Sequence, residues 1–228
     1  MDVYIAALRL YRRIVPRRAR DLLGRVRSRA PGWNTLQADV GAWSHHVYAK
    51  PQWEREYRHE RWSYMRGLTE LARYSVIAGY ISYLRSGGSI LDLGCGEGIL
   101  RERLDPASYS RYVGVDIAQT AIDAARARSS AAAASFICCD ITTFEPDAGF
   151  DVIVLNEVLY YVQDPIAVLR RYQRCLQPDG ILILSSYAHP HSEQNWRTLE
   201  QAFHFFDETR TSHVGSGCAW SCRVLRAL

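Results

Sequence analysis

The chain has 228 residues, of which 48% are hydrophobic and 23% are charged. This composition is normal for one globular domain with additions, and the absence of any uninterrupted apolar run of about 18 residues excludes a membrane-spanning helix. The net charge of +4 is uneven, because residues 1–31 hold nine arginines and two aspartates and so leave −3 for the remainder. A mildly acidic body disfavours nucleic acid as its substrate.

Residues 2–29 carry apolar residues at helical spacing on both sides of Pro16, with arginines between them. This pattern predicts that residues 1–32 form a basic amphipathic helical arm, hereafter the basic arm, which ends at Pro31-Gly32. Two interpretations stay open. A basic amphipathic helix can lie on an anionic surface such as the inner membrane, or the arm packs on its own domain or on a second copy in a homodimer.

Residues 33–66 are rich in aromatic side chains interleaved with acids and arginines. The aromatic residues are Trp33, Trp43, Tyr48, Trp53, Tyr57, Trp62 and Tyr64. We interpret this stretch as a cap that precedes the main fold, which is expected to occupy residues 67–228. His45 and His46 are adjacent and therefore point apart, so no metal site is expected there.

Residues 68–84 have apolar side chains at helical spacing, which predicts a helix that packs on a sheet. The stretch from 89 to 100, SILDLGCGEGIL, then combines an apolar run, an acid and three alternate glycines. Glycines let the backbone turn tightly and let a ligand approach without Cβ atoms in the way. This stretch therefore predicts a buried strand that turns into a helix at a ligand-binding loop.

Residues 112–116, 135–140 and 150–156 are expected to be further strands, each followed by or ending in a polar residue. Asp116 lies 22 residues after Gly94, an offset at which an acid can bind two ribose hydroxyls in a Rossmann-like crevice. The polar groups of Asp116, Asp140 and Asn156 should cluster where the strand ends meet the glycine loop.

The remaining segments continue the alternation of helix and strand. Helices are expected at 97–104, at 119–128, directly after the N-cap pair Asp164-Pro165, and at 195–203. Strands are expected at 181–186, 209–213 and 219–225. This order predicts an α/β fold with a doubly wound, mainly parallel seven-stranded sheet whose last two strands form an antiparallel hairpin. The six cysteines lack C-x-x-C spacing, and no secretory signal is visible, so we expect reduced thiols and a cytoplasmic protein.

The pattern Asp-x-Gly-x-Gly-x-Gly resembles the first motif of class I S-adenosylmethionine-dependent methyltransferases, and the segment FDVIVLNEVLYYVQDP resembles a later one. The similarity is greatest to the bacterial NodS-type N-methyltransferase branch and weaker to methyltransferases of glycan clusters. It implies the Rossmann-like methyltransferase fold, S-adenosylmethionine as cofactor, and a lid formed by the N-terminal extension. The cofactor-binding residues that it implies are Trp62, Tyr64, Arg73, Asp92, Gly94, Cys95, Gly96, Gly98, Asp116, Ile117, Asp140, Ile141 and Asn156.

For Arg73, a salt bridge to Glu70 or to a lid acid competes with a contact to the cofactor carboxylate. A methyl acceptor that is an alcohol must also lose a proton, and an amine must arrive neutral. The expected catalytic candidates follow the fourth and fifth strands: Glu157, Tyr160, Tyr161, His189 and His191. Many methyltransferases have a histidine near the positions of Tyr160 and Tyr161, and its absence here weakens the assignment at these two tyrosines.

The function that follows is methyl transfer to a hydroxyl or amine of a small molecule or glycan, as in polysaccharide or natural-product biosynthesis. Two other classes stay open. One is a non-catalytic module that binds S-adenosylmethionine or a partner, and the other is a nicotinamide oxidoreductase.

Overall fold

The computed structural model describes residues 49–129, 132–188 and 190–227. The basic arm and the cap residues up to 48 therefore lie outside the described residues. In the described part, seven strands form one sheet in the order β3-β2-β1-β4-β5-β7-β6. The strands are β1 (Ser89–Leu93), β2 (Arg111–Asp116), β3 (Ala134–Cys138), β4 (Phe150–Asn156), β5 (Leu176–Tyr187), β6 (Phe205–His213) and β7 (Cys218–Arg226).

Five strands run parallel, and β7 pairs antiparallel with both β5 and β6. The register aligns Leu93 of β1 with Val115 of β2 and with Leu155 of β4. The residues that follow these strands therefore lie side by side at one edge of the sheet. Because the strand order reverses between β2-β1 and β4, this edge is where ligands bind in open α/β sheets. The doubly wound seven-stranded fold predicted from the sequence is confirmed.

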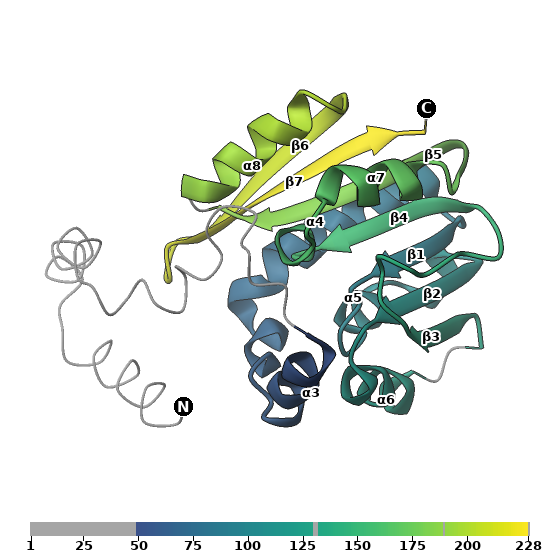
Figure 1. Cartoon of the computed structure of the whole chain (residues 1–228), viewed down its shortest axis with the longest axis vertical. Coiled ribbons are helices and arrows are strands. Elements are labelled where there is room, and N and C mark those ends of the chain that lie inside the picture. The colour runs from purple at the N-terminus through teal and green to yellow at the C-terminus, as the bar shows by residue number, and fades with distance from the viewer. Residues whose placement is uncertain (1–48, 130–131, 189, 228) are drawn as a thin grey trace, which may run out of the picture. The chain divides into compact units, whose positions relative to one another are not determined.

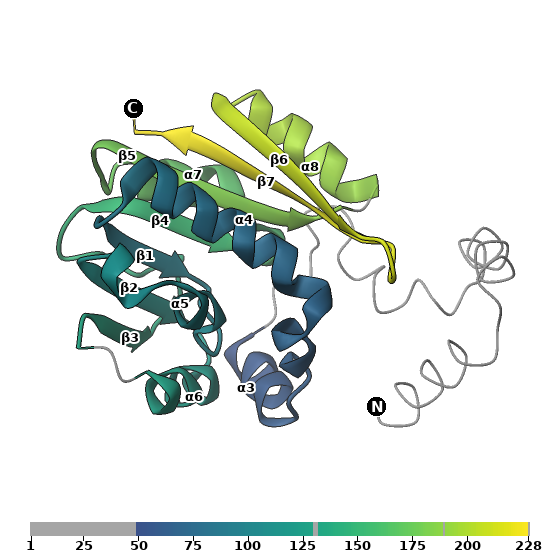
Figure 2. The ribbon, with the colours of Figure 1, turned by 180° about the vertical axis from the view of Figure 1, so that it is seen from behind.

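Helices cover both faces of the sheet (Figures 1 and 2). One face carries α4 (Leu68–Arg85), α5 (Ile99–Arg103) and α6 (Gln119–Arg128), and the other carries α7 (Pro165–Gln173) and α8 (Pro190–Glu200). Buried residues of the first three helices join one apolar cluster, which includes Ile77 and Ile122. Leu169 of α7 and Trp196 of α8 join the second cluster, on the opposite face. The core is thus two apolar layers that hold the sheet rigid between them.

The helix boundaries follow local signals. Asp164 caps α7, since its carboxylate accepts the backbone N–H of Ala167 at 2.9 Å and Pro165 occupies the first turn. Short 3-10 turns occur at η2 (Ser63–Arg66), η3 (Pro106–Ser108) and η4 (Leu159–Tyr161). The observed α8 starts five residues before the expected 195, and the observed α5 is shorter than the expected 97–104.

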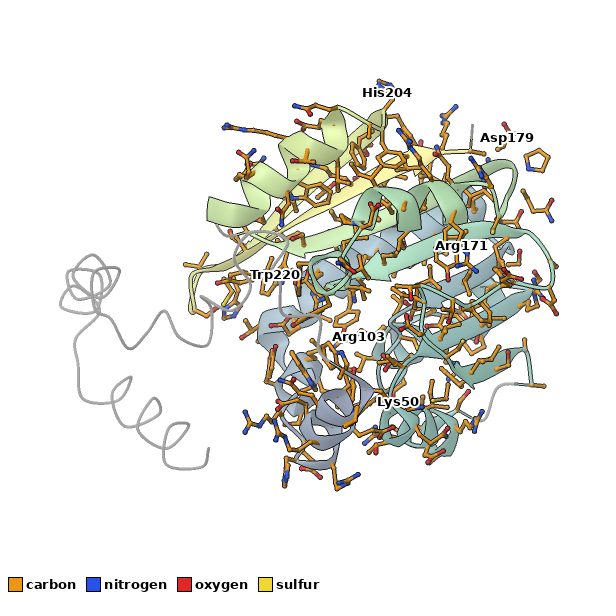
Figure 3. All side chains as sticks on the ribbon, in the orientation of Figure 1. Lys50, Arg103, Arg171, Asp179, His204 and Trp220 are labelled. Carbon is orange, nitrogen blue, oxygen red and sulfur yellow. The ribbon has the colours of Figure 1, made fainter. Side chains whose placement is uncertain are left out.

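The sequence pattern did not predict helix α3 (Lys50–Arg58), which belongs to the cap. It lies beside α6, on the side of the sheet toward which the parallel strands point (Figures 1 and 2). Pro51 stands in its first turn, where proline is tolerated. Figure 3 shows Lys50 at the start of this helix, next to α6. The described part of the cap therefore begins over the carboxyl edge of the sheet.

Candidate functional site

The glycine loop joins β1 to α5 and is tightly enclosed. Gly94, Gly96 and Gly98 all have positive φ angles, of 72°, 53° and 76°. A Cβ added at Gly94 would lie 2.3 Å from a methyl carbon of Val158, and one at Gly96 would lie 2.9 Å from the hydroxyl of Tyr57. Glycine is thus favoured at Gly94 by conformation and by space, and at Gly96 chiefly by its positive φ. The loop is bounded on one side by the segment after β4 and on the other by α3.

Asp116 ties the end of β2 to the glycine loop. Its carboxylate accepts the backbone N–H of Gly96 at 2.9 Å and that of Ala118 at 2.9 Å. The N–H groups of Gly94 and Cys95 donate to the carbonyl of Val115 at 2.7 and 3.0 Å. Burial raises the pKa of Asp116 to about 6, although these backbone hydrogen bonds oppose the rise. The acid therefore lies inside the loop that it shapes, at the place predicted for a ribose-binding carboxylate.

Asp92, at the fourth position of β1, faces inward. Only 2% of its surface is exposed, and its carboxylate accepts the hydroxyl of Tyr112. Burial raises the pKa of Asp92 to about 7, and the nearby charge of Asp116 adds to this effect. Asp92 thus supports the strand beneath the glycine loop and faces Tyr112 of β2.

The segment after β3 is fixed beside Asp116. The N–H of Cys139 donates to the carbonyl of Asp116 at 2.9 Å. One carboxylate oxygen of Asp140 accepts the N–H and the hydroxyl of Thr142, both at 2.8 Å. Ile141 is buried, while Ile117 is half-buried. These residues lie where the resemblance predicts the adenine, and their roles stay predictions.

Arg73 of α4 is at the centre of a buried group of charges. Its guanidinium donates to the side-chain oxygen of Asn156 at 2.6 Å and to the carboxylate of Glu70 at 2.8 Å. A carboxylate oxygen of Glu157 lies 3.8 Å away. Arg73 is 1% exposed. The predicted Glu70 salt bridge is therefore present, and the same arginine also reaches the end of β4.

Glu157 follows β4 with a positive φ of 63°, an uncommon conformation for a residue other than glycine. Its carboxylate accepts the hydroxyls of Ser185 at 3.0 Å and Tyr160 at 2.9 Å, and the N–H of Tyr187 at 3.0 Å. Burial raises the pKa of Tyr160 well above its ordinary value, so this phenol stays protonated. Three donors to one carboxylate favour an anchoring role for Glu157 over proton transfer.

Aromatic rings connect the cap to the segment after β4. Trp53 of α3 packs edge-on against Tyr161 with ring centroids 4.7 Å apart, and it also contacts Trp62 at 5.7 Å. Tyr160 packs against Tyr161 at 4.5 Å. Tyr64, a predicted lid residue, is 54% exposed. The sequence pattern placed Trp53 and Tyr57 among the aromatic residues of the cap and proposed only Trp62 and Tyr64 for the cofactor. The spacing of four residues between Trp53 and Tyr57 is the signal that they share a helix face.

The two histidines predicted as proton acceptors are not placed. His189 lies outside the described residues, and of His191 only the backbone is described, in the first turn of α8. Within the described ranges, no group of three or more His, Cys, Asp or Glu side chains could hold a metal ion. No helix among the described residues is long and apolar enough to cross a membrane.

This arrangement of strand ends and glycine loop has known counterparts. Residues 55–215, well over half of the chain, match a family described as "Methyltransferase domain". The chain belongs to this methyltransferase family. Its resemblance to class I S-adenosylmethionine-dependent methyltransferases is confirmed, and S-adenosylmethionine is the cofactor of that class.

Individual relatives differ in their acceptors. The chain is 31% identical over 118 residues to a ubiquinone biosynthesis O-methyltransferase of Bradyrhizobium diazoefficiens, a match that covers 51% of this chain and 44% of the relative. It is 37% identical over 102 residues to nodulation protein S of the same organism, with 43% and 48% covered. The chain thus spans about half the length of the curated relatives that it matches.

A solved structure shares the fold. The N-methyltransferase NodS of Bradyrhizobium japonicum, in complex with S-adenosyl-L-homocysteine, superposes with a TM-score of 0.61 at 22% identity, covering 73% of this chain and 91% of that chain. At this identity the likeness shows the fold alone.

The residues present fit the cofactor of the family. A glycine loop with three positive φ angles, a buried acid at the end of β2 and a polar side chain at the end of β4 all lie at one sheet edge. These are the features that a nucleotide-like ligand requires at a topological switch point. The individual contacts of Asp116, Asn156 and Arg73 with the cofactor stay predictions.

Proposed function

We propose that this chain binds S-adenosylmethionine at the carboxyl edge of the sheet and methylates a hydroxyl or amine of a small-molecule or glycan acceptor. The observation that carries the proposal is the juxtaposition of the glycine loop with Asp116. The acid accepts the N–H of Gly96 at 2.9 Å and is 6% exposed. Family membership supports methyl transfer, while the acceptor class rests on the resemblance described from the sequence.

Each part of the site has a proposed task. Asp116 binds the ribose, Asp140 and Ile141 bracket the adenine, and the glycine loop lets the cofactor approach the backbone. When bound, S-adenosylmethionine supplies an electrophilic methyl group. The chain itself supplies orientation, because an in-line displacement requires chiefly that the acceptor nucleophile be held behind that group.

The acceptor is proposed to lie among the segment after β4, the end of β5 and the cap. Tyr187 at the end of β5 packs edge-on against Trp220 of β7, with ring centroids 5.7 Å apart. Figure 3 shows Trp220 on the side of the sheet where the cap lies. The aromatic side chains that converge here would exclude water from the reacting atoms.

Proton removal from an alcohol acceptor is assigned to His189 or His191. Both follow β5 in the sequence, and β5 runs parallel to β4 toward the sheet edge at which Glu157 and Tyr160 lie. The three hydrogen bonds that Glu157 accepts support its role as an anchor of this edge, which would leave proton transfer to a histidine. An amine acceptor that arrives neutral would need no such base.

The test has two arms. Calorimetry with S-adenosylhomocysteine should detect binding, and labelled-methyl transfer should be screened against sugars, nucleotide sugars, lipid-linked glycans, phenols and amines. The relatives above include one O-methyltransferase and one N-methyltransferase by name, so both acceptor classes belong in the screen. Binding without turnover on any acceptor would favour a non-catalytic module, and absence of binding would overturn the proposal.

A further inference from the structure

The free backbone N–H groups at the N-terminus of helix α6 find their acceptor in a residue of the aromatic cap segment. Ala118, at the N-cap position, has no side-chain oxygen to accept the free N–H groups of the first turn. Glu54 of α3 supplies the acceptor instead. Its carboxylate accepts the N–H of Gln119 at 2.7 Å, the N–H of Thr120 at 3.1 Å and the hydroxyl of Thr120 at 2.6 Å.

This contact is also favoured electrostatically. The N-terminus of a helix carries a partial positive charge, so a carboxylate placed there is stabilised. Burial acts to raise the pKa of Glu54, but the hydrogen bonds from Thr120 and Gln119 hold that pKa below its ordinary value. Glu54 is therefore ionised at neutral pH.

The docking of α3 has little apolar burial to support it. None of its residues is fully buried. Besides Glu54, the described contacts include Lys50 with the thiol of Cys138 at 3.3 Å, Trp53 with Tyr161, and the Tyr57 hydroxyl near Gly96. Because no residue of this helix is fully buried, the three hydrogen bonds that Glu54 accepts contribute to the equilibrium between the docked and the undocked helix.

We propose that Glu54 is a positioning residue that holds α3 on α6, and that through this contact it keeps Tyr57 against the glycine loop and sets the rate at which bound cofactor leaves. The statement about cofactor exit rests on the proposed function. The geometry supports it because α6 starts three residues after Asp116, so a carboxylate that caps α6 lies next to the proposed ribose-binding edge.

Hydrogen exchange on the ligand-free protein tests the contact itself. In Glu54→Gln, the amides of Gln119 and Thr120 should exchange roughly tenfold faster, since a hydrogen bond to a charged group is lost. Glu56→Gln is the matched control, because Glu56 lies on the same helix and pairs with Arg61 at 3.3 Å. Unchanged exchange in Glu54→Gln, or the same change in both variants, would overturn the proposal.

Cofactor exit is measured by stopped-flow release of S-adenosylhomocysteine. Glu54→Gln and Thr120→Val should each accelerate release, by roughly tenfold and about threefold, and the double variant should release no faster than Glu54→Gln alone. Fully additive effects or an unchanged rate would sink the claim that this contact governs exit. If the wild type binds no S-adenosylhomocysteine, the proposed function fails, whereas the exchange experiment still decides whether Glu54 holds α3.

Discussion

The carboxylate of Asp116 and the backbone N–H of Gly96 are joined by a hydrogen bond of 2.9 Å. This bond links the end of β2 to the loop after β1. The acid that we propose for the ribose is therefore oriented by the loop that it faces. Preorganisation of this kind lowers the entropic cost of binding.

Replacing Asp116 should weaken cofactor binding. In Asp116→Ala the proposed ribose partner is lost, and the affinity for S-adenosylhomocysteine should fall by about 1–3 kcal/mol, the range for hydrogen bonds to a charged group. Calorimetry measures this, with circular dichroism to verify the fold. Asp147→Ala is the control, since the Asp147 side chain is 88% exposed. Equal affinity of the folded Asp116 variant and the wild type would remove Asp116 from the site.

Asp92 should make stability depend on pH. Its pKa is raised from an ordinary value of 3.8 to about 7 by burial. Between these values the native state binds more protons than the unfolded state, so the free energy of unfolding falls as pH rises from about 4 through about 7. Asp92→Asn keeps an acceptor for Tyr112 and lacks the buried charge. Urea unfolding at pH 5 to 8 should therefore show a flatter profile and a gain of more than about 1 kcal/mol at pH 8. A profile parallel to that of the wild type would contradict this.

Gly94 should tolerate alanine less well than Gly87 does. Both have positive φ angles, 72° and 76°, but the space around Gly87 is open while a Cβ at Gly94 would meet Val158. Conformational strain alone costs about 1–2 kcal/mol. Gly94→Ala should cost more than Gly87→Ala in urea unfolding, and Val158→Ala should recover part of the difference. If Gly94→Ala and Gly87→Ala lost the same free energy of unfolding, backbone strain alone, and not the contact with Val158, would set the cost.

Loss of Arg73 should destabilise the fold strongly. Arg73→Met leaves the buried carboxylates of Glu70 and Glu157 without their cation, which typically costs 3–5 kcal/mol. Arg61→Met is the control, because the Arg61 side chain is 53% exposed and pairs with Glu56 at 3.3 Å. The exposed pair should contribute about 0–1 kcal/mol. Thermal unfolding that ranks the two variants equally would argue against the buried charge group.

The basic arm gives a prediction from the sequence alone. With +7 on residues 1–31, attraction to an anionic surface should contribute about 1 kcal/mol per nearby arginine. The full chain should sediment with anionic vesicles at low salt, and deletion of residues 1–31 should abolish this. Neutral vesicles are the control. Recovery of the full chain in the supernatant with anionic vesicles would instead favour packing of the arm on the body or on a second copy.

The parts of the fold that are determined by residues adjacent in the sequence were predictable. The run SILDLGCGEGIL shows its strand and its glycine loop, and Asp164-Pro165 shows the start of α7. The start of β5 was missed because Leu176 pairs with Phe150 before the chain bulges outward and resumes pairing at Ile181. Asp179 lies within that bulge with φ of 62°, which explains why the segment resembles a turn.

The contacts of the site depend on partners far apart in the sequence. Arg73 pairs with Glu70 as the spacing suggests, but its bond to Asn156 spans 83 residues. Glu54 likewise finds its partners 65 and 66 residues away. Periodicity shows which face of a helix is apolar, and it does not show which distant N–H groups lack an acceptor. The cap was therefore recognisable as aromatic, while its attachment to α6 was not.

The position of β7 inside the sheet has a consequence for how the chain matures. β7 is the last strand in chain order among the described residues, yet it pairs with β5 on one side and β6 on the other. While residues 218–226 are still within the ribosome, β5 has an open edge and β6 has no partner. Both would be exposed to strand pairing with other chains during that interval.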